Sequence, residues 1–203
     1  MAGVSQMSGF RIAITGTPAT GKSSVVEIIA KSNSITVREL AAEHGCLGGA
    51  EKAGEAVEID VEKLHRILTA EWAEESPSRG GEKSSSEGGG KTPAGHEKSA
   101  ENIYIDGHLS HHLPVDAIIV LRCRPEVLSE RMRGRGWPRA KITDNAEWEL
   151  LGGPWLELDE NSPPILEIDT TIASAAAVAS QALEWVGADF VPRFPAERAD
   201  WIR

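Results

Sequence analysis

Eight residues near the start of the chain, Gly16–Ser23, restrict its possible folds more than any other feature. They read G-T-P-A-T-G-K-S, with a mostly apolar run at Phe10–Thr15 before them and a stretch of helical periodicity at Lys22–Ser32 after them. A loop of this spacing cradles phosphates when a strand leads into it and a helix leaves it, because backbone N–H groups and the helix N-terminus then converge on one point. The order of the three segments therefore predicts a P-loop, and with it a nucleotide-binding protein.

The remaining sequence alternates between strand-like and helix-like segments. Strands are predicted at Arg11–Thr15, Asn102–Asp106, Asp116–Arg122 and Ile165–Asp169, and the first and third of these are expected to be buried. Helices are predicted at Lys22–Ser32, Thr36–His44, Asp60–Glu75, Pro125–Arg133 and Ile172–Val186. This alternation is typical of an α/β fold in which helices cover a mostly parallel sheet. We expect one P-loop domain over residues 10–190, with a flexible tail at 1–9 and a C-terminal tail at 191–203.

The composition changes within this domain. Ser76–Ala100 contains six glycines, six serines and two prolines, with almost no large apolar side chain. Such a segment cannot bury enough apolar surface to offset the entropy lost on ordering. We predict a disordered insertion at 76–101, with a regulatory or partner-binding role as the alternative.

The overall charge and the cysteine content exclude several classes of protein. The chain has 31 acidic and 21 basic residues and a formal charge of −10, which argues against broad, strong binding of nucleic acid. Cys46 and Cys123 are the only cysteines, too few for a disulfide framework or a cysteine-based zinc site. We find no signal-peptide pattern and no apolar run long enough to span a bilayer. We expect a cytoplasmic protein without a membrane partner.

The segment Ile103–His108, which reads I-Y-I-D-G-H, carries a second pattern. An aspartate at the end of an apolar strand, as at Asp106, is where P-loop proteins hold the Mg²⁺ shell, although aspartate also ends strands as a turn former. His108 could orient water or contact a phosphate. His111 and His112 raise the question of a metal site, but no cysteine or nearby acidic cluster completes one. We therefore expect them to be solvated or structural.

The segment Arg122–Lys141 is locally basic, with seven basic residues against two glutamates. An ordinary solvated helix face explains Arg131 and Arg133. The R-G-W-P sequence that begins at Arg135 differs, because its glycine breaks the helix and places an arginine on a mobile tip. A guanidinium in such a place can close over phosphates and neutralise the charge that develops during transfer.

Taken together, G-T-P-A-T-G-K-S, the strand-end D-G-H, the stretch L-R-C-R-P-E-V-L-S-E-R-M-R-G-R-G-W and the following K-I-T-D-N resemble a known family. This family is the small adenylate-kinase-like NTPases of the coilin-interacting nuclear ATPase type, with their archaeal counterparts. The resemblance covers roughly Phe10–Asn145 apart from the insertion, and returns in E-I-D-T-T and the closing helix. It implies a nucleoside-monophosphate (NMP) kinase fold, with an NMP-binding segment at about 36–59 and a short lid at about 134–144.

The P-loop pattern and the resemblance together assign a set of site residues. The expected ATP contacts are Gly16, Ala19, Gly21, Lys22, Ser23, Ser24 and Arg135. Ser23 and Asp106 are expected to hold Mg²⁺. The expected catalytic residues are Lys22, Asp106, His108 and Arg135, with Lys22 reaching the β- and γ-phosphates.

Three positions depart from the family pattern. Ala19 stands where the family usually has glycine, and we expect it to be tolerated provided that its φ is negative. Trp137 replaces the usual tyrosine and keeps a stacking face. Arg38 is the only arginine of the NMP-binding segment, and it lies one helical turn upstream of a position where relatives can carry one.

The resemblance implies an adenylate kinase or broad-specificity NMP kinase that transfers the γ-phosphate of ATP to AMP and also hydrolyses ATP. It also implies a role in maturation of the small ribosomal subunit, through a ribosomal protein of its platform and the pre-ribosomal particle. The alternative is an ATPase assembly factor with little NMP kinase activity, for which the charge of −10 would complement a basic partner. A third hypothesis is a P-loop kinase for another small metabolite.

Overall fold

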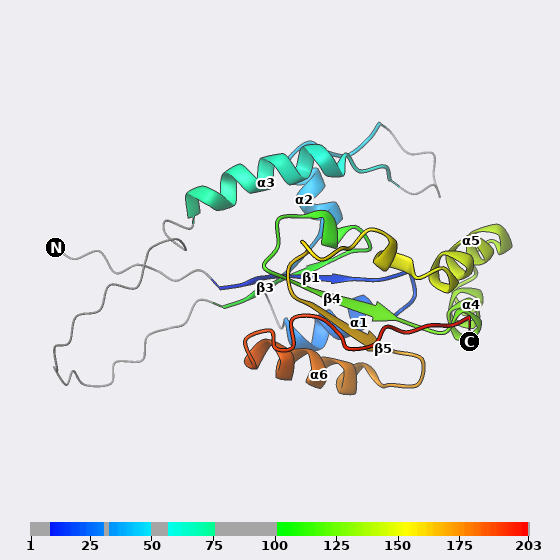
Figure 1. The fold of residues 1–203 in the computed structure, drawn as a ribbon. Coiled ribbons are helices and arrows are strands. Elements are labelled where there is room, and N and C mark those ends of the chain that lie inside the picture. Colours follow the sequence, from blue (N-terminus) through cyan, green and yellow to red (C-terminus); the bar gives the residue numbers. More distant parts are fainter. Residues whose placement is uncertain (1–8, 31–32, 50–56, 76–100, 203) are drawn as a thin grey trace, which may run out of the picture.

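Figure 1 shows the computed structural model, which describes residues 9–30, 33–49, 57–75 and 101–202. Apart from Gly9 and Glu101, the predicted tail at 1–9 and the predicted insertion at 76–101 lie outside these residues. The same holds for residues 50–56 of the expected NMP-binding segment. The description below concerns the four described ranges.

The centre of the molecule is a five-stranded sheet in the order β2-β3-β1-β4-β5, with parallel pairing throughout. The strands are β1 (Arg11–Thr15), β2 (Ser34–Thr36), β3 (Ile103–Asp106), β4 (Ala117–Arg122) and β5 (Ile165–Asp169). The parallel sheet and four of its strands are confirmed. The edge strand β2 was not predicted, and Thr36 proves to be the N-cap residue of the following helix rather than a member of it.

Six α-helices and two 3-10 helices accompany the described strands. The α-helices are α1 (Lys22–Ile29), α2 (Val37–Glu43), α3 (Val61–Glu75), α4 (Pro125–Gly134), α5 (Arg139–Leu150) and α6 (Ala175–Gly187). The 3-10 helices are η1 (Ser110–His112) and η2 (Gly153–Leu156). Helix α6 begins three residues later than predicted, because the Ser174 hydroxyl accepts a hydrogen bond from the amide of Ala177 and caps it there. Helix α5 was not predicted.

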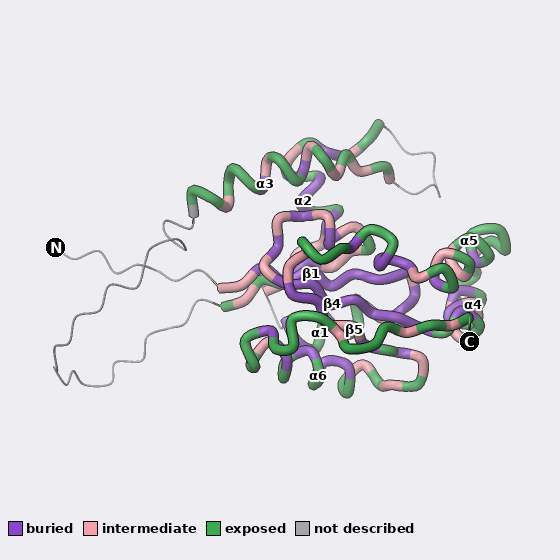
Figure 2. The backbone as a smooth tube through the Cα atoms, viewed as in Figure 1, coloured by how far each residue is buried: buried purple, intermediate pink, exposed green. Residues whose placement is uncertain are grey.

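Helices α1 and α6 lie on one side of the sheet and α2 and α3 on the other (Figure 1), and the strands between them are largely buried (Figure 2). Each side of the sheet carries one apolar cluster. Successive side chains of a strand point to opposite faces. Ile12 and Ile14 of β1 therefore pack against α1 and α6, whereas Ala13 between them packs on the side of α2 and α3. A smaller cluster joins α4 and α5 through Leu128, Met132 and Ile142. Ala19 belongs to this cluster too, so α4 and α5 pack directly against the loop that follows β1.

Residues 191–202, within the range predicted to be a tail, run back along the domain towards α4 and α5 (Figure 1). The amide of Ile165 at the start of β5 donates to the carbonyl of Arg193 at 2.7 Å. The guanidinium carbon of Arg198 lies 3.8 Å from the centre of the Trp155 ring. Trp201 donates its indole N–H to Glu149 at 3.3 Å. This segment therefore contacts the sheet, η2 and α5.

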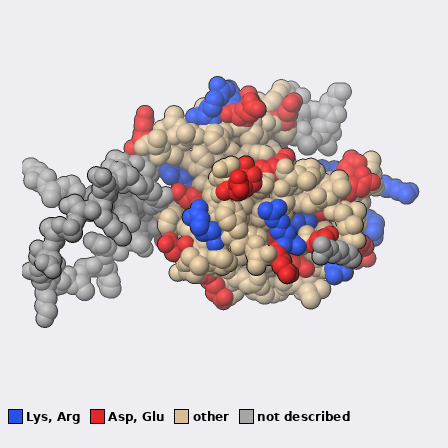
Figure 3. All heavy atoms as spheres, viewed as in Figure 1, with Lys and Arg blue, Asp and Glu red and all other residues tan. Residues whose placement is uncertain are grey.

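The helices and the surface charges of the described residues bear on two classes of partner, membranes and nucleic acids. No described helix is long and apolar enough to cross a bilayer. In Figure 3, the basic and acidic side chains of the described residues are interspersed over the visible face rather than gathered into one basic patch.

Candidate functional site

The predicted P-loop connects β1 to α1, as the sequence requires. Gly16 has a φ of +136° and Gly21 a φ of +103°, both in the region that side chains resist. A Cβ atom on Gly16 would lie 2.2 Å from the carbonyl oxygen of Leu121, so the loop also passes too close to β4 for any side chain there. Gly21 is the N-cap of α1, so the helix begins at Lys22 and its N-terminus lies within the loop. This is the geometry that gathers backbone N–H groups for an anion.

Ala19 does not meet the condition we set for it. Its φ is +72°, in the left-handed region, so alanine is present here although the condition of a negative φ is not met. Ala19 is 7% exposed and packs in the cluster beside α4 and α5. The packing of the methyl group therefore opposes the backbone penalty of about 1–2 kcal/mol that a non-glycine residue carries in this region.

We predict that Ala19→Val will lower the free energy of unfolding by about 2 kcal/mol, because a β-branched residue is strongly disfavoured at positive φ. Ala19→Gly should change it by less than about 1 kcal/mol, since relief of backbone strain offsets the lost methyl contact and the added chain entropy. Urea unfolding of the two variants and the unchanged protein measures both effects. A valine variant as stable as the unchanged protein would contradict the left-handed conformation of Ala19.

One cleft, about 340 Å³ in volume, brings together most of the predicted site residues. The P-loop and the start of α1 contribute Ala19, Gly21, Lys22, Ser23 and Ser24. Asp106 at the end of β3, His108 two residues later and Arg135 also line the cleft. Thr36, Val37 and Arg38 at the start of α2 line the same cleft, as do Ile59 and Trp137. Its volume falls within the range of about 300–1,000 Å³ that is usual for small-molecule sites. Gly16 does not line the cleft but contacts Lys22 through its carbonyl.

Lys22 is held at the base of this cleft by the loop itself. Its ammonium donates to the carbonyl oxygens of Gly16 at 2.8 Å and Thr17 at 3.1 Å. Burial lowers the pKa of Lys22 from 10.5 to about 8, although the charges of Asp106 and Glu149 oppose this shift. The side chain is therefore cationic at pH 7 and rests on neutral carbonyls, which makes it a receptor for an anion.

The depressed pKa of Lys22 makes stability depend on pH. Between about pH 8 and pH 10.5 the unfolded chain holds a proton at this position that the folded chain has released. Because the unfolded state binds more protons there, the contribution of Lys22 to the free energy of unfolding rises with pH across that window. Urea unfolding at several pH values should show this rise in the unchanged protein relative to Lys22→Met. Parallel profiles for the two proteins would contradict the shifted pKa.

Asp106 stands at the carboxyl end of β3, next to the P-loop. Strands β1 and β3 pair in parallel with Ile14 opposite Asp106, so the aspartate is at the edge of the sheet from which the loop leaves. The hydroxyl of Ser23 donates to the Asp106 carboxylate at 2.8 Å. The sequence placed these two oxygen groups at one site, and they are in direct contact.

His108 is two residues further along and faces the same cleft. Burial lowers its pKa below the usual value, and the positive charge of Lys22 lowers it further. The imidazole is therefore neutral at pH 7 and can serve as a hydrogen-bond donor and acceptor. Gly107 between the two residues packs tightly, because a Cβ atom there would lie 2.6 Å from Val37.

The expected lid at 134–144 is a tight turn followed by the first part of α5. Helix α4 ends at Gly134, Gly136 has a φ of +71°, and Pro138 precedes α5. The ammonium of Lys141 lies 4.2 Å above the Trp137 ring. Only four residues separate the two helices, so Arg135 is presented by a short corner rather than by a long loop.

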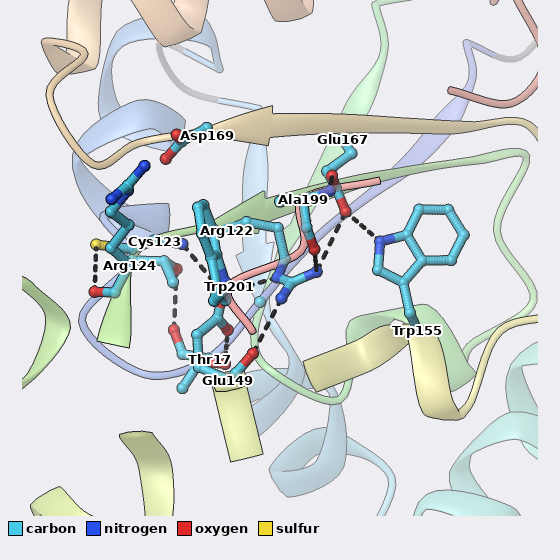
Figure 4. A network of polar contacts seen from close by, with 12 residues as sticks. Thr17, Arg122, Cys123, Arg124, Glu149, Trp155, Glu167, Asp169, Ala199 and Trp201 are labelled. Atoms are coloured by element: carbon cyan, nitrogen blue, oxygen red, sulfur yellow. Dashed lines mark hydrogen bonds and ion pairs between the residues drawn. The ribbon is translucent and has the colours of Figure 1, made fainter. Parts of the chain in front are cut away.

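A buried ionic network that the sequence did not reveal lies beneath the P-loop (Figure 4). Glu149 of α5 is fully buried and accepts from the Nε of Arg122 at 2.7 Å and from the amide of Cys123 at 3.1 Å. The hydroxyl of Thr17, inside the P-loop, donates to the other oxygen of Glu149. Arg122 also reaches Glu167 at 3.3 Å. Arg122 therefore contributes no surface charge to the basic segment in which the sequence placed it.

The fold and the cleft define a class of protein: a P-loop nucleotide-binding protein with a helix-covered parallel sheet of the NMP-kinase type. The chain also matches the model of the AAA_18 family, described as an AAA domain, over residues 12–152. The protein belongs to this family.

Archaeal relatives cover most of the chain. A protein of Archaeoglobus fulgidus named "Putative adenylate kinase" is 38% identical over 169 residues, which is 82% of this chain and 76% of the relative. A protein of the same name from Pyrococcus abyssi is 32% identical over 163 residues, or 79% of this chain and 74% of the relative. The crystal structure of TT1252 from Thermus thermophilus superposes with a TM-score of 0.50 at 14% identity, covering 90% of this chain and 98% of the other, and shares the fold.

Proposed function

We propose that the protein transfers the terminal phosphoryl group of ATP to AMP or to a closely similar nucleoside monophosphate. The observation that carries this proposal is the single cleft that runs from the P-loop to the first turn of α2. Three basic side chains line it, namely Lys22 from the P-loop, Arg38 from α2 and Arg135 from the corner after α4. A second phosphorylated substrate can therefore lie within reach of a nucleotide held by the loop. The adenylate kinase names of the archaeal relatives support the same reaction.

The residues of the cleft would act mainly by positioning and by neutralising charge, which is what phosphoryl transfer requires. On binding ATP, the Lys22 ammonium would exchange the carbonyls of Gly16 and Thr17 for phosphate oxygens. Gly21, Ser23 and Ser24 would bind the phosphates through backbone N–H groups at the start of α1. Arg135 would approach from the corner between α4 and α5 and stabilise the negative charge of the transferring group. His108, neutral at pH 7, would hydrogen-bond to a phosphate or to a water beside it.

The residues present fit Mg²⁺, which we include in the proposed function. The Ser23 hydroxyl and the Asp106 carboxylate are in contact at 2.8 Å, and such hard oxygen groups are the ligands that Mg²⁺ prefers. When bound, Mg²⁺ supplies neutralisation of the β- and γ-phosphate charge. Ser23 would hold it directly, and Asp106 directly or through a water.

The other proposal uses the same cleft with water as the phosphoryl acceptor. In that case the protein would be an ATPase assembly factor. Its partners would be a ribosomal protein of the small-subunit platform and the pre-ribosomal particle, as the sequence resemblance implies. The presence of Arg38 in the cleft favours the kinase, because a hydrolase has no need for a second anion-binding side chain near α2.

The deciding experiment follows ADP and inorganic phosphate separately during ATP turnover, with and without AMP. We expect AMP to increase ADP formation while phosphate stays low. Arg135→Ala should reduce this AMP-dependent ADP formation, whereas Arg133→Ala, on the exposed face of α4, should leave it unchanged and serves as the matched control. Phosphate release that is indifferent to AMP would reject the kinase proposal in favour of the ATPase.

A further inference from the structure

We propose that His111, His112 and Glu157 form a zinc-binding site, separate from the proposed Mg²⁺ site. The sequence pointed away from a metal here because it offered no acidic residue near the two histidines. The fold brings such an acidic residue to the histidines. Glu157, which follows η2, is 46 residues from His111 in the sequence and contacts both imidazoles. The three groups are the one potential metal-ligand cluster of this kind among the described residues.

The distances within the cluster match those between ligands of one ion. A single carboxylate oxygen, Oε2 of Glu157, lies 2.9 Å from Nε2 of His111 and 3.3 Å from Nε2 of His112. The two rings are 4.1 Å apart between centroids and tilted by 35°, and each has its Nε2 atom near the same carboxylate oxygen. Zinc–ligand bonds of about 2.0–2.1 Å in a tetrahedron place neighbouring ligand atoms about 3.3 Å apart. Small side-chain movements would therefore be enough to admit the ion.

The hydrogen bonds around His111 leave the correct nitrogen for a metal. Its Nδ1 lies 2.8 Å from the hydroxyl of Thr15, and that hydroxyl donates its one proton to the carbonyl of His108 at 3.0 Å. The Thr15 oxygen then accepts from Nδ1–H of His111. In a neutral ring this leaves a lone pair on Nε2. That nitrogen and the carboxylate oxygen of Glu157 are then both acceptors, with no proton between them. A cation between the two converts this contact into ligation, and the Thr15 bond orients the ring in the way that is usual for metal-bound histidines.

The exposure of the three side chains gives the ion a way in and an open position. The His111 side chain is 1% exposed, whereas those of His112 and Glu157 are 33% and 38% exposed. The buried imidazole fixes the site within the fold, and the other two ligands meet solvent. Two imidazoles and a carboxylate suit Zn²⁺, with a water as the fourth ligand.

The site would connect two parts of the structure that lie beside the P-loop. His111 belongs to η1, which follows β3 in the sequence. Glu157 follows η2, which in turn follows α5. Thr15, which orients His111, is the last residue of β1 and immediately precedes Gly16. A bound zinc ion would therefore stabilise the segment after α5 against the end of the strand that leads into the loop.

Zinc binding to the purified, metal-free protein tests the proposal, with a chromogenic chelator as competitor. We expect one Zn²⁺ per chain, a rise in Tm of about 5–10 °C at about 100 times the dissociation constant, and visible absorption of four-coordinate Co²⁺ when cobalt replaces zinc. His112→Ala and Glu157→Gln change partly exposed side chains, so they should preserve the fold and lower zinc affinity at least about 100-fold.

Two control variants make the test specific. His44 lies 2.9 Å from Glu71 in an ordinary histidine–carboxylate pair without a second imidazole, so His44→Ala should bind zinc like the unchanged protein. Asp106→Asn should do so too, because it alters only the proposed Mg²⁺ site. The proposal is rejected if the unchanged protein takes up no zinc at micromolar concentration, if His112→Ala binds it as well as the unchanged protein, or if either control loses the binding.

Discussion

ATP turnover should fall at least about 100-fold when Lys22 is replaced by methionine, with little change in the fold. Lys22 is the cation that the P-loop presents to the cleft, and methionine has a similar length without the charge. Loss of one preorganised donor from a water-poor site typically costs about 10²–10³ in rate. The comparison requires initial rates at saturating ATP, together with a thermal unfolding curve for each protein.

Lys63 provides the matched control for this experiment. Its ammonium also donates to a backbone carbonyl, that of Gly45 at 2.9 Å, but it lies on α3 outside the cleft. Lys63→Met should therefore retain the turnover of the unchanged protein. If Lys22→Met retained more than about a tenth of the activity while Lys63→Met behaved normally, the role that we propose for Lys22 would be wrong.

Glu149→Ala should be the most destabilising single change to the described structure. Among the residues that the structure describes, it leaves the buried guanidinium of Arg122 with Glu167 as its one anionic partner. It also removes the acceptor of the Thr17 hydroxyl. Removing one partner of a buried ion pair typically costs about 3–5 kcal/mol, which corresponds to a fall in Tm of about 10 °C in a domain of this size. Because Thr17 belongs to the P-loop, nucleotide affinity should fall as well.

Glu147, two residues earlier on the same helix, separates this effect from a general effect on α5. Its side chain is exposed, so Glu147→Ala should change Tm by no more than about 2 °C. Calorimetry with and without ATP measures both variants. Equal Tm values for Glu149→Ala and Glu147→Ala would show that the buried network does not hold the loop.

The sequence was sufficient for the parts of the fold that depend on local pattern. The P-loop spacing fixed β1, the loop and α1, and the apolar runs predicted β3, β4 and β5. Asp106 could be placed beside Ser23 because parallel strands end at the same edge of the sheet. The short edge strand β2 was missed, since three partly exposed residues offer too few positions for a periodic pattern.

The remainder depends on contacts between residues that are distant in sequence. No local pattern indicates that Glu149 meets Arg122, or that Glu157 meets His111, because those pairs form only when α5 and η2 fold back over the sheet. Likewise, the φ of Ala19 is imposed by the P-loop and by packing against α4 and α5, not by its own preference. The P-loop and strand-end residues of the cleft were thus predictable from the sequence. The buried ion pairs and the packing that hold them in place were not.

The docking of residues 191–202 has a practical consequence for anyone who shortens or extends the protein. Cutting at residue 190 would remove Trp201 from the Glu149 carboxylate and the Ala199 amide from Glu167. It would thereby let solvent reach the same buried charges that support the nucleotide loop. Ile202 directly follows Trp201, so a purification tag or a fused reporter that replaced Ile202 would be joined next to that contact.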